Sequence, residues 1–232
     1  MPINDYSIIS NQYASLDNSG TAFLAFKQIP DLLKQHAIGK KTLDYGCGSG
    51  SSTLFLNEIG LDVEGVDISH DMLQEARQLN IKTPFNLIES AKLPHADNTF
   101  DLVFSSFVLF EISNKLELIR VINEIYRVLK TGGLFIGITG SEELYNHKWL
   151  SLNVDFEQNK NLKSGDIAKV LLKDAGLLVY DYYWTNKDYL EMIHTSKFSL
   201  LETLFPLGED TDGYAWEDEK HFPPYVIYVL SK

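Results

Sequence analysis

The chain has 232 residues, 44% of them apolar and 22% charged, which is enough to bury the core of one α/β domain. Its formal net charge of −12, with Lys and Arg scattered along the chain, argues against nucleic acid as a substrate and leaves only a local basic patch open. No run approaches the ~20 apolar residues of a membrane helix, and the first residues lack a secretory signal pattern. The single cysteine, Cys47, rules out an internal disulfide, so we expect a cytoplasmic protein without a membrane partner.

Residues 1–38 are expected to form an N-terminal cap. Their apolar positions approximate helical spacing at Phe23, Phe26, Ile29, Leu32 and Leu33. Pro30 falls inside this stretch and is expected either to break the helix or to lie in its first turn. The chain shows no repeat, linker or low-complexity tract, so residues 1–232 are predicted to form a single domain.

From Lys41 onward, strand-like and helix-like segments alternate. Strands are predicted at residues 41–46, 62–67, 85–89, 100–105, 133–139, 177–183 and 225–230. Helices are predicted at residues 52–59, 70–79, 114–129 and 164–175, the last between an N-capping Ser164 and a C′ glycine at Gly176. This alternation with short links indicates a parallel sheet with helices on both faces.

The predicted helix 114–129 has one apolar face and one charged face. The apolar face is expected to pack in the core and carries Leu118, Ile122, Ile125 and Leu129. The charged face has i, i+3 and i+4 spacing, is expected to be solvated, and carries Glu117, Arg120, Glu124 and Arg127.

The stretch from Thr42 to Gly50 is the most informative motif of the chain. An apolar strand ends in Asp44 and turns through three glycines at Gly46, Gly48 and Gly50. Glycine is needed where φ is positive or where a ligand lies close to the backbone. The loop therefore indicates a site for a nucleoside.

A second acid and the glycine spacing specify the kind of nucleotide. Asp67 ends the next strand, 21 residues after Gly46, where nucleotide-binding α/β folds place an acid on the ribose hydroxyls. The pattern here is G-x-G-x-G, and Ser51 occupies the position of the third glycine of a dinucleotide fingerprint. The spacing thus argues against an NAD-dependent dehydrogenase.

Further motifs follow in order and resemble one family. They are Val66–Leu73, Leu93–Pro94 with Asp97–Val103, Ser105–Leu109 and Leu129–Gly133. Together with the glycine loop they make residues 39–140 similar to a class I S-adenosylmethionine-dependent methyltransferase. The resemblance implies a three-layer Rossmann-like, doubly wound seven-stranded α/β sheet, mostly parallel with the last strand antiparallel. It also implies S-adenosyl-L-methionine as cofactor and S-adenosyl-L-homocysteine as product.

The resemblance also implies which residues bind the cofactor, with no metal. They are Asp44, Gly46, Cys47, Gly48, Ser49 and Gly50 around the methionine portion, Asp67 on the ribose, Ile68 and Met72 on the adenine faces, Glu89 and Ser90 at the adenine edge, Ser105 and Ser106 beside the methionine ammonium, and Tyr13 from the cap. Taken alone, Ile68 and Met72 would be assigned to the core and Asp67 to a helix cap. Glu89 replaces the more frequent aspartate, and Cys47 is expected to fill space rather than to act as a nucleophile.

The reaction implied by the resemblance is a single displacement at an activated methyl group. Positioning of the acceptor supplies much of such a rate, and a base is needed only when the acceptor must lose a proton early. The catalytic residues therefore stay unknown, with Glu111, His147 and His221 as candidates. Each of these is otherwise a surface or packing residue.

Two segments outside the alternating frame are predicted to form the acceptor site, residues 141–163 and 184–222. The second is unusually long and rich in aromatic residues, which suit a flat, apolar acceptor. The acceptor-binding residues are predicted to be Tyr6, Phe107, Trp184 and Trp216. The alternative is that these aromatics fill a secondary core or a dimer contact, so the protein is expected to be a monomer or a homodimer.

The sequence therefore predicts methyl transfer from S-adenosylmethionine to a small or medium-sized organic acceptor, at O or N rather than C. A protein or peptide acceptor is the first alternative. A regulator that binds the cofactor without turnover is the second.

Overall fold

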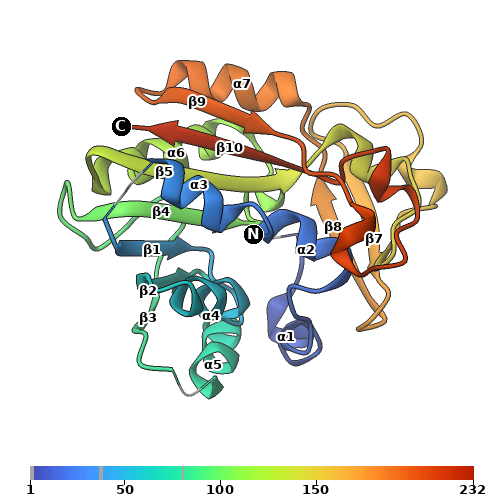
Figure 1. Cartoon of the computed structure of the whole chain (residues 1–232), viewed down its shortest axis with the longest axis horizontal. Helices are drawn as coiled ribbons and strands as arrows, with labels where there is room; N and C mark the ends of the chain where they lie inside the picture. The colour runs from blue at the N-terminus through green and yellow to red at the C-terminus, as the bar shows by residue number, and fades with distance from the viewer. Residues whose placement is uncertain (1–2, 37–38, 80) are drawn as a thin grey trace.

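A seven-stranded β-sheet forms the middle layer of the molecule (Figure 1). The computed structural model describes residues 3–36, 39–79 and 81–232. The strands lie in the order β3 (Phe85–Leu87), β2 (Asp62–Asp67), β1 (Lys41–Tyr45), β4 (Phe100–Ser106), β5 (Leu129–Gly140), β10 (Tyr225–Ser231) and β9 (Ser199–Leu204). All pairs are parallel except those of β10, which runs antiparallel to both of its neighbours. The predicted fold class is confirmed.

Helices cover both faces of this sheet. One face carries α2 (Phe23–Phe26), α3 (Ile29–His36) and α4 (Ser51–Glu58), and the other carries α6 (Lys115–Val128) and α7 (Asn186–Thr195). Pro30 lies in the first turn of α3, where its missing N–H needs no partner. Helix α5 (His70–Gln78) packs beside β2 and β3, and α1 (Tyr6–Ala14) lies against α5 (Figure 1). None of the helices in the described ranges is long and apolar enough to cross a bilayer.

A separate antiparallel sheet stands beside the end of β5. It consists of β6 (Leu152–Asn153), β7 (Ile167–Leu172) and β8 (Leu177–Tyr182) (Figure 1). The predicted helix at 164–175 is therefore wrong. Ser164 does not cap a helix, because its hydroxyl donates to the Asp188 carboxylate. Gly176 has φ +60° and closes the β7–β8 hairpin, with its N–H donating to the Lys173 carbonyl at 3.2 Å.

The segment 184–222 is likewise not a long loop. It contains helix α7, which begins with a capping box between Thr185 and Asp188, and strand β9. The strand predicted at 177–183 exists as β8 but belongs to the small sheet. The sixth strand of the large sheet in chain order is β9, which lies at the edge of that sheet. In Figure 1, α7 and β9 lie at the edge of the large sheet opposite β2 and β3.

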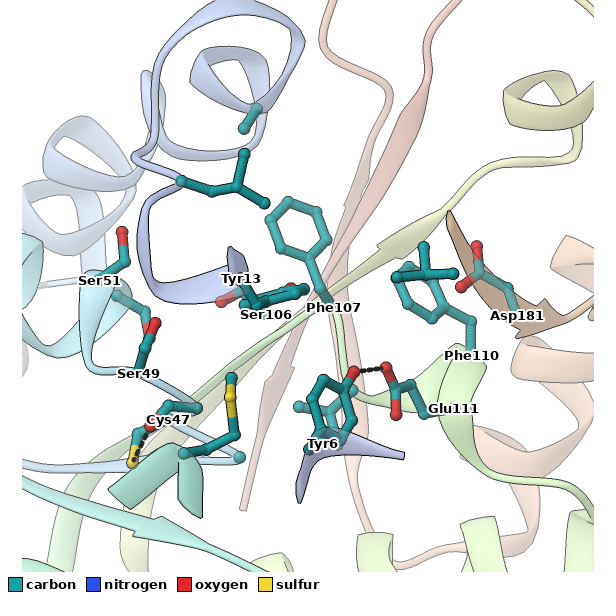
Figure 2. A pocket seen from close by; sticks show the side chains of 18 of the residues that line it. Tyr6, Tyr13, Cys47, Ser49, Ser51, Ser106, Phe107, Phe110, Glu111 and Asp181 are labelled. Atoms are coloured by element: carbon teal, nitrogen blue, oxygen red, sulfur yellow. Dashed lines mark hydrogen bonds between the residues drawn. The ribbon is translucent and has the colours of Figure 1, made fainter. Parts of the chain in front are cut away.

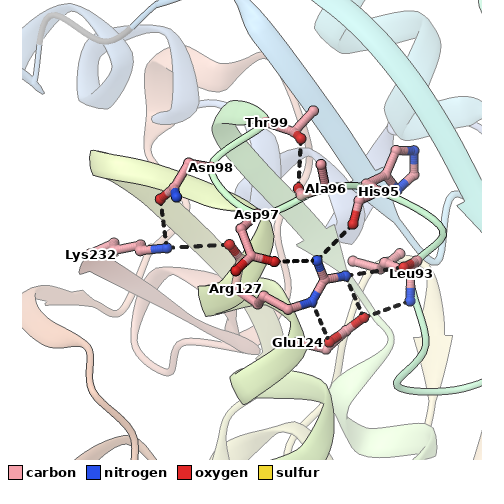
Figure 3. A network of polar contacts seen from close by, with 9 residues as sticks. All are labelled: Leu93, His95, Ala96, Asp97, Asn98, Thr99, Glu124, Arg127 and Lys232. Carbon is pink, nitrogen blue, oxygen red and sulfur yellow. Dashed lines mark hydrogen bonds and ion pairs between the residues drawn. The ribbon is translucent and has the colours of Figure 1, made fainter.

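The charged face of α6, which was expected to be solvated, makes structural contacts. Its Arg127 binds the loop that precedes β4 (Figure 3). Its guanidinium donates to the carbonyls of Leu93 at 3.1 Å and His95 at 2.7 Å, and to the carboxylates of Asp97 at 2.8 Å and Glu124 at 2.7 Å. The Leu93–Asp97 motif therefore has a structural role, which is to fasten the loop before β4 to α6.

Candidate active site

The glycine loop follows β1 and is left-handed at each of its three glycines, with φ of +74° at Gly46, +52° at Gly48 and +90° at Gly50. A Cβ at Gly46 would lie 2.2 Å from Cγ2 of Val108, and one at Gly50 would lie 2.7 Å from Cδ1 of Leu79. Two of the glycines are thus required by close packing of the protein against the loop, in addition to their backbone conformation.

Asp44 lies beneath this loop and is fully buried. Its Oδ2 accepts hydrogen bonds from the hydroxyls of Ser52 at 2.7 Å and Thr53 at 2.6 Å, which fix the first turn of α4. Burial raises the pKa of Asp44 to about 6. Asp44 therefore supports the loop from below and does not line the cavity described next.

Asp67 connects the end of β2 to the loop. Its Oδ2 accepts from the backbone N–H of Gly48 at 2.9 Å, and its Oδ1 accepts from that of Ser69 at 2.7 Å. Burial raises the pKa of Asp67, while these two backbone donors oppose the shift. An ionised carboxylate accepts about four hydrogen bonds, so two acceptor positions remain for ligand hydroxyls.

A cavity of about 670 Å³ opens above the carboxyl ends of the central strands. The predicted site residues that line this cavity are Tyr6, Tyr13, Gly46, Cys47, Gly48, Ser49, Asp67, Ile68, Met72, Ser90, Ser106, Phe107 and Glu111. They come from α1, the glycine loop, the end of β2, the start of α5, the loop after β3, and the end of β4 with the segment that follows it. The cavity thus joins the predicted cofactor site to the two residues of α1 and to the end of β4 (Figure 2).

Four predicted cofactor contacts lie outside the cavity. Besides Asp44, these are Gly50, Glu89 and Ser105. Glu89 is exposed and pairs with Lys92 at 3.2 Å, so the adenine edge is left to Ser90, whose hydroxyl donates to Glu117 at 2.6 Å. Ser105 is fully buried within β4.

The two tryptophans predicted as pocket walls are also elsewhere, and no described residue of 184–222 lines the cavity. Trp184 is buried against the back of the sheet, and its indole N–H donates to the carbonyl of Ile112 at 3.1 Å. Trp216 packs on Tyr214 and donates to the carbonyl of Glu209 at 3.2 Å. Both tryptophans belong to local packing, which corrects the predicted acceptor wall.

The histidine candidates lie outside the cavity too. The His147 ring stacks on Phe222 at 3.6 Å between centroids and lies 2.8 Å from the Glu143 carboxylate. His221 lines a separate hollow together with Phe222. Of the three candidates for a general base, Glu111 alone lines the large cavity.

Glu111 ends the 3₁₀ turn η2 (Leu109–Glu111) and is held from the N-terminal segment. Its Oε1 accepts from the Tyr6 hydroxyl and, at 3.3 Å, from the Asn4 amide (Figure 2). Asn4 is itself fixed on β8, since it donates to the Tyr180 carbonyl at 2.8 Å and accepts from the Tyr180 N–H at 2.9 Å. Burial, with a smaller contribution from Asp181, raises the pKa of Glu111 to about 8.

Asp181 is the functional candidate that sequence reasoning missed. It projects from β8 into the same cavity, is 4% exposed, and accepts from the Tyr145 hydroxyl at 3.1 Å (Figure 2). Burial raises its pKa to about 7. A usable signal exists in the sequence, because Asp181 alternates with the apolar Leu177 and Val179 on the buried face of a strand, where acids are rare.

Phe107 follows the end of β4 and forms the middle of an aromatic wall. It has φ +62°, a conformation that is rare for a bulky residue and that clusters at functional sites. Its ring lies 5.0 Å from that of Tyr225, 6.2 Å from that of Phe26 and 6.3 Å from that of Phe110, centroid to centroid. All four rings line the cavity.

Cys47 contacts the cavity but packs against the core below it, with Leu73, Ala76 and Phe85. Its side chain is 4% exposed, and burial, followed by the charges of Asp44 and Asp67, raises the pKa of the thiol. A neutral, enclosed thiol is a poor nucleophile, so this environment favours the space-filling role.

The fold and site together define a Rossmann-like methyltransferase architecture, and comparisons with known proteins agree with it. Residues 43–137 match the family described as "Methyltransferase domain". A solved S-adenosylmethionine-dependent methyltransferase from Mesorhizobium loti superposes with a TM-score of 0.64 over 87% of this chain and 96% of that chain, at 19% identity. Residues 43–137 are thus similar to a methyltransferase domain, and the fold is that of solved S-adenosylmethionine-dependent methyltransferases.

Curated relatives carry the names of different reactions. A malonyl-[acyl-carrier protein] O-methyltransferase of Buchnera aphidicola is 33% identical over 54% of this chain and 51% of its own length. The mitochondrial arginine-hydroxylase NDUFAF5 of Homo sapiens is 29% identical over 75% of this chain and 51% of its own length. The chain thus spans about half the length of these curated relatives.

The lining residues fit S-adenosylmethionine. Asp67 keeps two acceptor positions for a ribose, and Ile68 and Met72 offer apolar surface for a purine. The acidic side chains suit a positively charged sulfonium, and the volume lies within the usual range for ligand pockets.

Proposed function

We propose that this protein transfers the methyl group of S-adenosylmethionine to a small or medium-sized organic acceptor, at nitrogen or oxygen rather than carbon. One observation carries the proposal: a single cavity runs from the glycine loop and Asp67 to the aromatic wall around Phe107 and the carboxyl group of Glu111. A donor and an acceptor bound in one enclosed space meet the positional requirement of a direct displacement.

Within this proposal each end of the cavity has its own task. Bound S-adenosylmethionine supplies a methyl carbon activated by the positive sulfur. The backbone from Gly46 to Ser49, with Asp67 and Ser90, would hold and orient that donor. The ring of Phe107 would exclude water between the two ends, and Glu111 would receive a proton from the acceptor, with Tyr6 fixing its orientation.

The main alternative differs in the acceptor that would bind near Glu111 and Asp181. A protein or peptide acceptor stays an alternative because a curated relative is named as an arginine hydroxylase. Against it stands the position of Glu111, which is half-buried, and of Asp181, which is buried, because both favour an acceptor small enough to enter the cavity. A cytoplasmic location rests on the single cysteine, and the absence of a nucleic-acid partner rests on the charge of −12.

The test combines binding with turnover. Calorimetry should detect S-adenosylmethionine and S-adenosylhomocysteine but not NAD. Incubation with donor labelled at the methyl group and a metabolite extract should then give a labelled small molecule together with S-adenosylhomocysteine. Label found in protein would favour the peptide alternative, and binding without any transfer would favour the regulator.

A further inference from the structure

We infer that the acceptor is a basic amine with an apolar body, bound between Glu111 and Asp181, and that its nitrogen receives the methyl group. This inference rests on the proposed methyl transfer and specifies the acceptor class. Three features of the cavity carry it: its charge, the free oxygens of its two buried acids, and its aromatic wall.

The charged residue types of the lining are all acidic over the part of the chain that the structure describes. Its acidic side chains are Asp17, Asp67, Glu111, Glu117, Asp174 and Asp181, and no described Lys, Arg or His joins them. An acceptor with a carboxylate or phosphate would therefore meet like charges without a cation to pair with it. An ammonium group would meet opposite charges in a site of low dielectric, where such attraction is strong.

The two deepest acids each keep an oxygen available. Glu111 uses Oε1 for Tyr6 and Asn4, and Asp181 uses Oδ2 for Tyr145, so the protein partners of both acids are neutral. Among the described residues, no donor reaches Oε2 of Glu111 or Oδ1 of Asp181. Both side chains line the cavity (Figure 2). Buried carboxylates are normally paired with a cation or neutralised, and here a cationic ligand would supply the partner.

The walls around these acids suit the rest of such a ligand. Tyr6 and Tyr13 meet edge to face at 5.8 Å, and Phe107 lies 5.0 Å from Tyr225. Aromatic faces attract cations and bury flat apolar groups. Val179 and the neighbouring apolar residues of β7 complete the surface on the side of Asp181.

The proton and electron balance of this step is simple. Below about pH 8 Glu111 holds a proton, which leaves to water when the ammonium binds beside it. The bound ammonium then passes one proton to the resulting carboxylate, and the freed nitrogen lone pair forms the new N–C bond with the methyl carbon. The C–S bond breaks, and its electron pair stays on sulfur, which becomes a neutral thioether. The product is an N-methylammonium ion, and Glu111 returns its proton to water. The raised pKa values of Glu111 and Asp181, about 8 and about 7, suit proton uptake near neutrality.

The first experiment compares acceptors that differ in one group. S-Adenosylhomocysteine formation is measured with tryptamine, tryptophol and tryptophan, and with phenethylamine, 2-phenylethanol and phenylalanine. We expect both amines to react, and their alcohols and amino acids to react at least ~100-fold more slowly, because each lacks the ammonium or adds a repelled carboxylate. An alcohol or amino acid that reacts as well as its amine overturns the inference.

If neither set of compounds reacts, the product labelled in the metabolite extract shows which atom the protein methylates. A labelled N-methyl product supports the inference. An O-methyl or C-methyl product overturns it and leaves the proposed function standing, whereas no labelled product at all overturns the proposed function itself.

The second experiment tests the two acids with a matched control. Asp181→Asn and Glu111→Gln should each raise the KM of the amine about 10- to 100-fold, and the Kd of S-adenosylhomocysteine should stay unchanged. Asp31→Asn, on the exposed face of α3 with an 87% exposed side chain, should change neither value. Both variants remove a buried acid and should melt no earlier than the parent, so a folded variant with an unchanged amine KM would refute the role of that acid.

Discussion

The packing of Val108 against Gly46 gives a quantitative test of the glycine loop. Gly46→Ala places a side chain in a left-handed conformation, φ +74°, which costs ~1–2 kcal/mol. The new Cβ would also lie 2.2 Å from Cγ2 of Val108, and relief of such overpacking costs a further ~1–3 kcal/mol. The free energy of unfolding should therefore fall by about 2–5 kcal/mol.

Gly60 provides the matched control for this substitution. Its φ is +91°, and nothing lies within 4 Å of where its Cβ would be, so Gly60→Ala carries the backbone cost without the clash. The double variant Gly46→Ala, Val108→Ala removes the clash and should recover about 1–3 kcal/mol relative to the sum of the single changes. Urea unfolding followed by circular dichroism measures each free energy. Equal losses at Gly46 and Gly60, or strict additivity with Val108→Ala, would refute the packing argument.

The remaining predictions concern the donor loop, the thiol, the charge network and pH. Asp67→Ala should weaken S-adenosylmethionine binding by about 2–4 kcal/mol, and calorimetry that gives the wild-type Kd would contradict the assignment. Cys47→Ala should keep both cofactor affinity and methyl transfer close to wild type. Loss of transfer at unchanged affinity would show that the thiol takes part in the reaction. Arg127→Ala should lower the free energy of unfolding by about 2–3 kcal/mol because it leaves the carbonyls and carboxylates of the loop before β4 without their donor, as urea titration will show. Because the folded state holds a proton on Glu111 up to about pH 8 and the unfolded chain loses it near its ordinary pKa of 4.5, stability should fall as pH rises between these values. Glu111→Gln should flatten that profile in thermal melts, and an unchanged slope would exclude the buried acid as its source.

Local patterns predicted the fold of residues 41–140 well. The strand ending in Asp44, the glycine loop and the acid at Asp67 lie within 24 residues, and each depends on near neighbours in the chain. A positive φ restricts the residue type directly, so the glycines mark the loop in any context. The alternating order of elements from 41 to 140 follows from the same short-range signals.

The fold of residues 141–232 depends on contacts between residues distant in the chain, and there the sequence pattern gave wrong predictions. Residues 164–175 contain an apolar run with a serine before it and a glycine after it, which suits a helix and a hairpin equally well. Pairing with β8 decides the outcome, and a single sequence does not encode that choice locally. Trp184 and Trp216 lie in a long aromatic-rich segment, which predicts an acceptor wall, but in the structure their rings are used for local packing. Asp181 belongs to no motif, and its one signal in the sequence is its place among apolar residues on the buried face of a strand.

The β6–β7–β8 sheet stands apart from the strands that hold the glycine loop. Its three strands pair only with one another, and it reaches the cavity through Asp181 and a few apolar side chains. The proposed acceptor contact of this sheet, Asp181, is thus encoded far along the chain from the glycine loop and Asp67, whereas Glu111 follows the central strand β4. Under the proposed function, mutations that reshape the hairpin change the acceptor contact at Asp181 and leave the glycine loop and Asp67 as they are, so proteins that share this fold can differ in acceptor without rebuilding the nucleoside site.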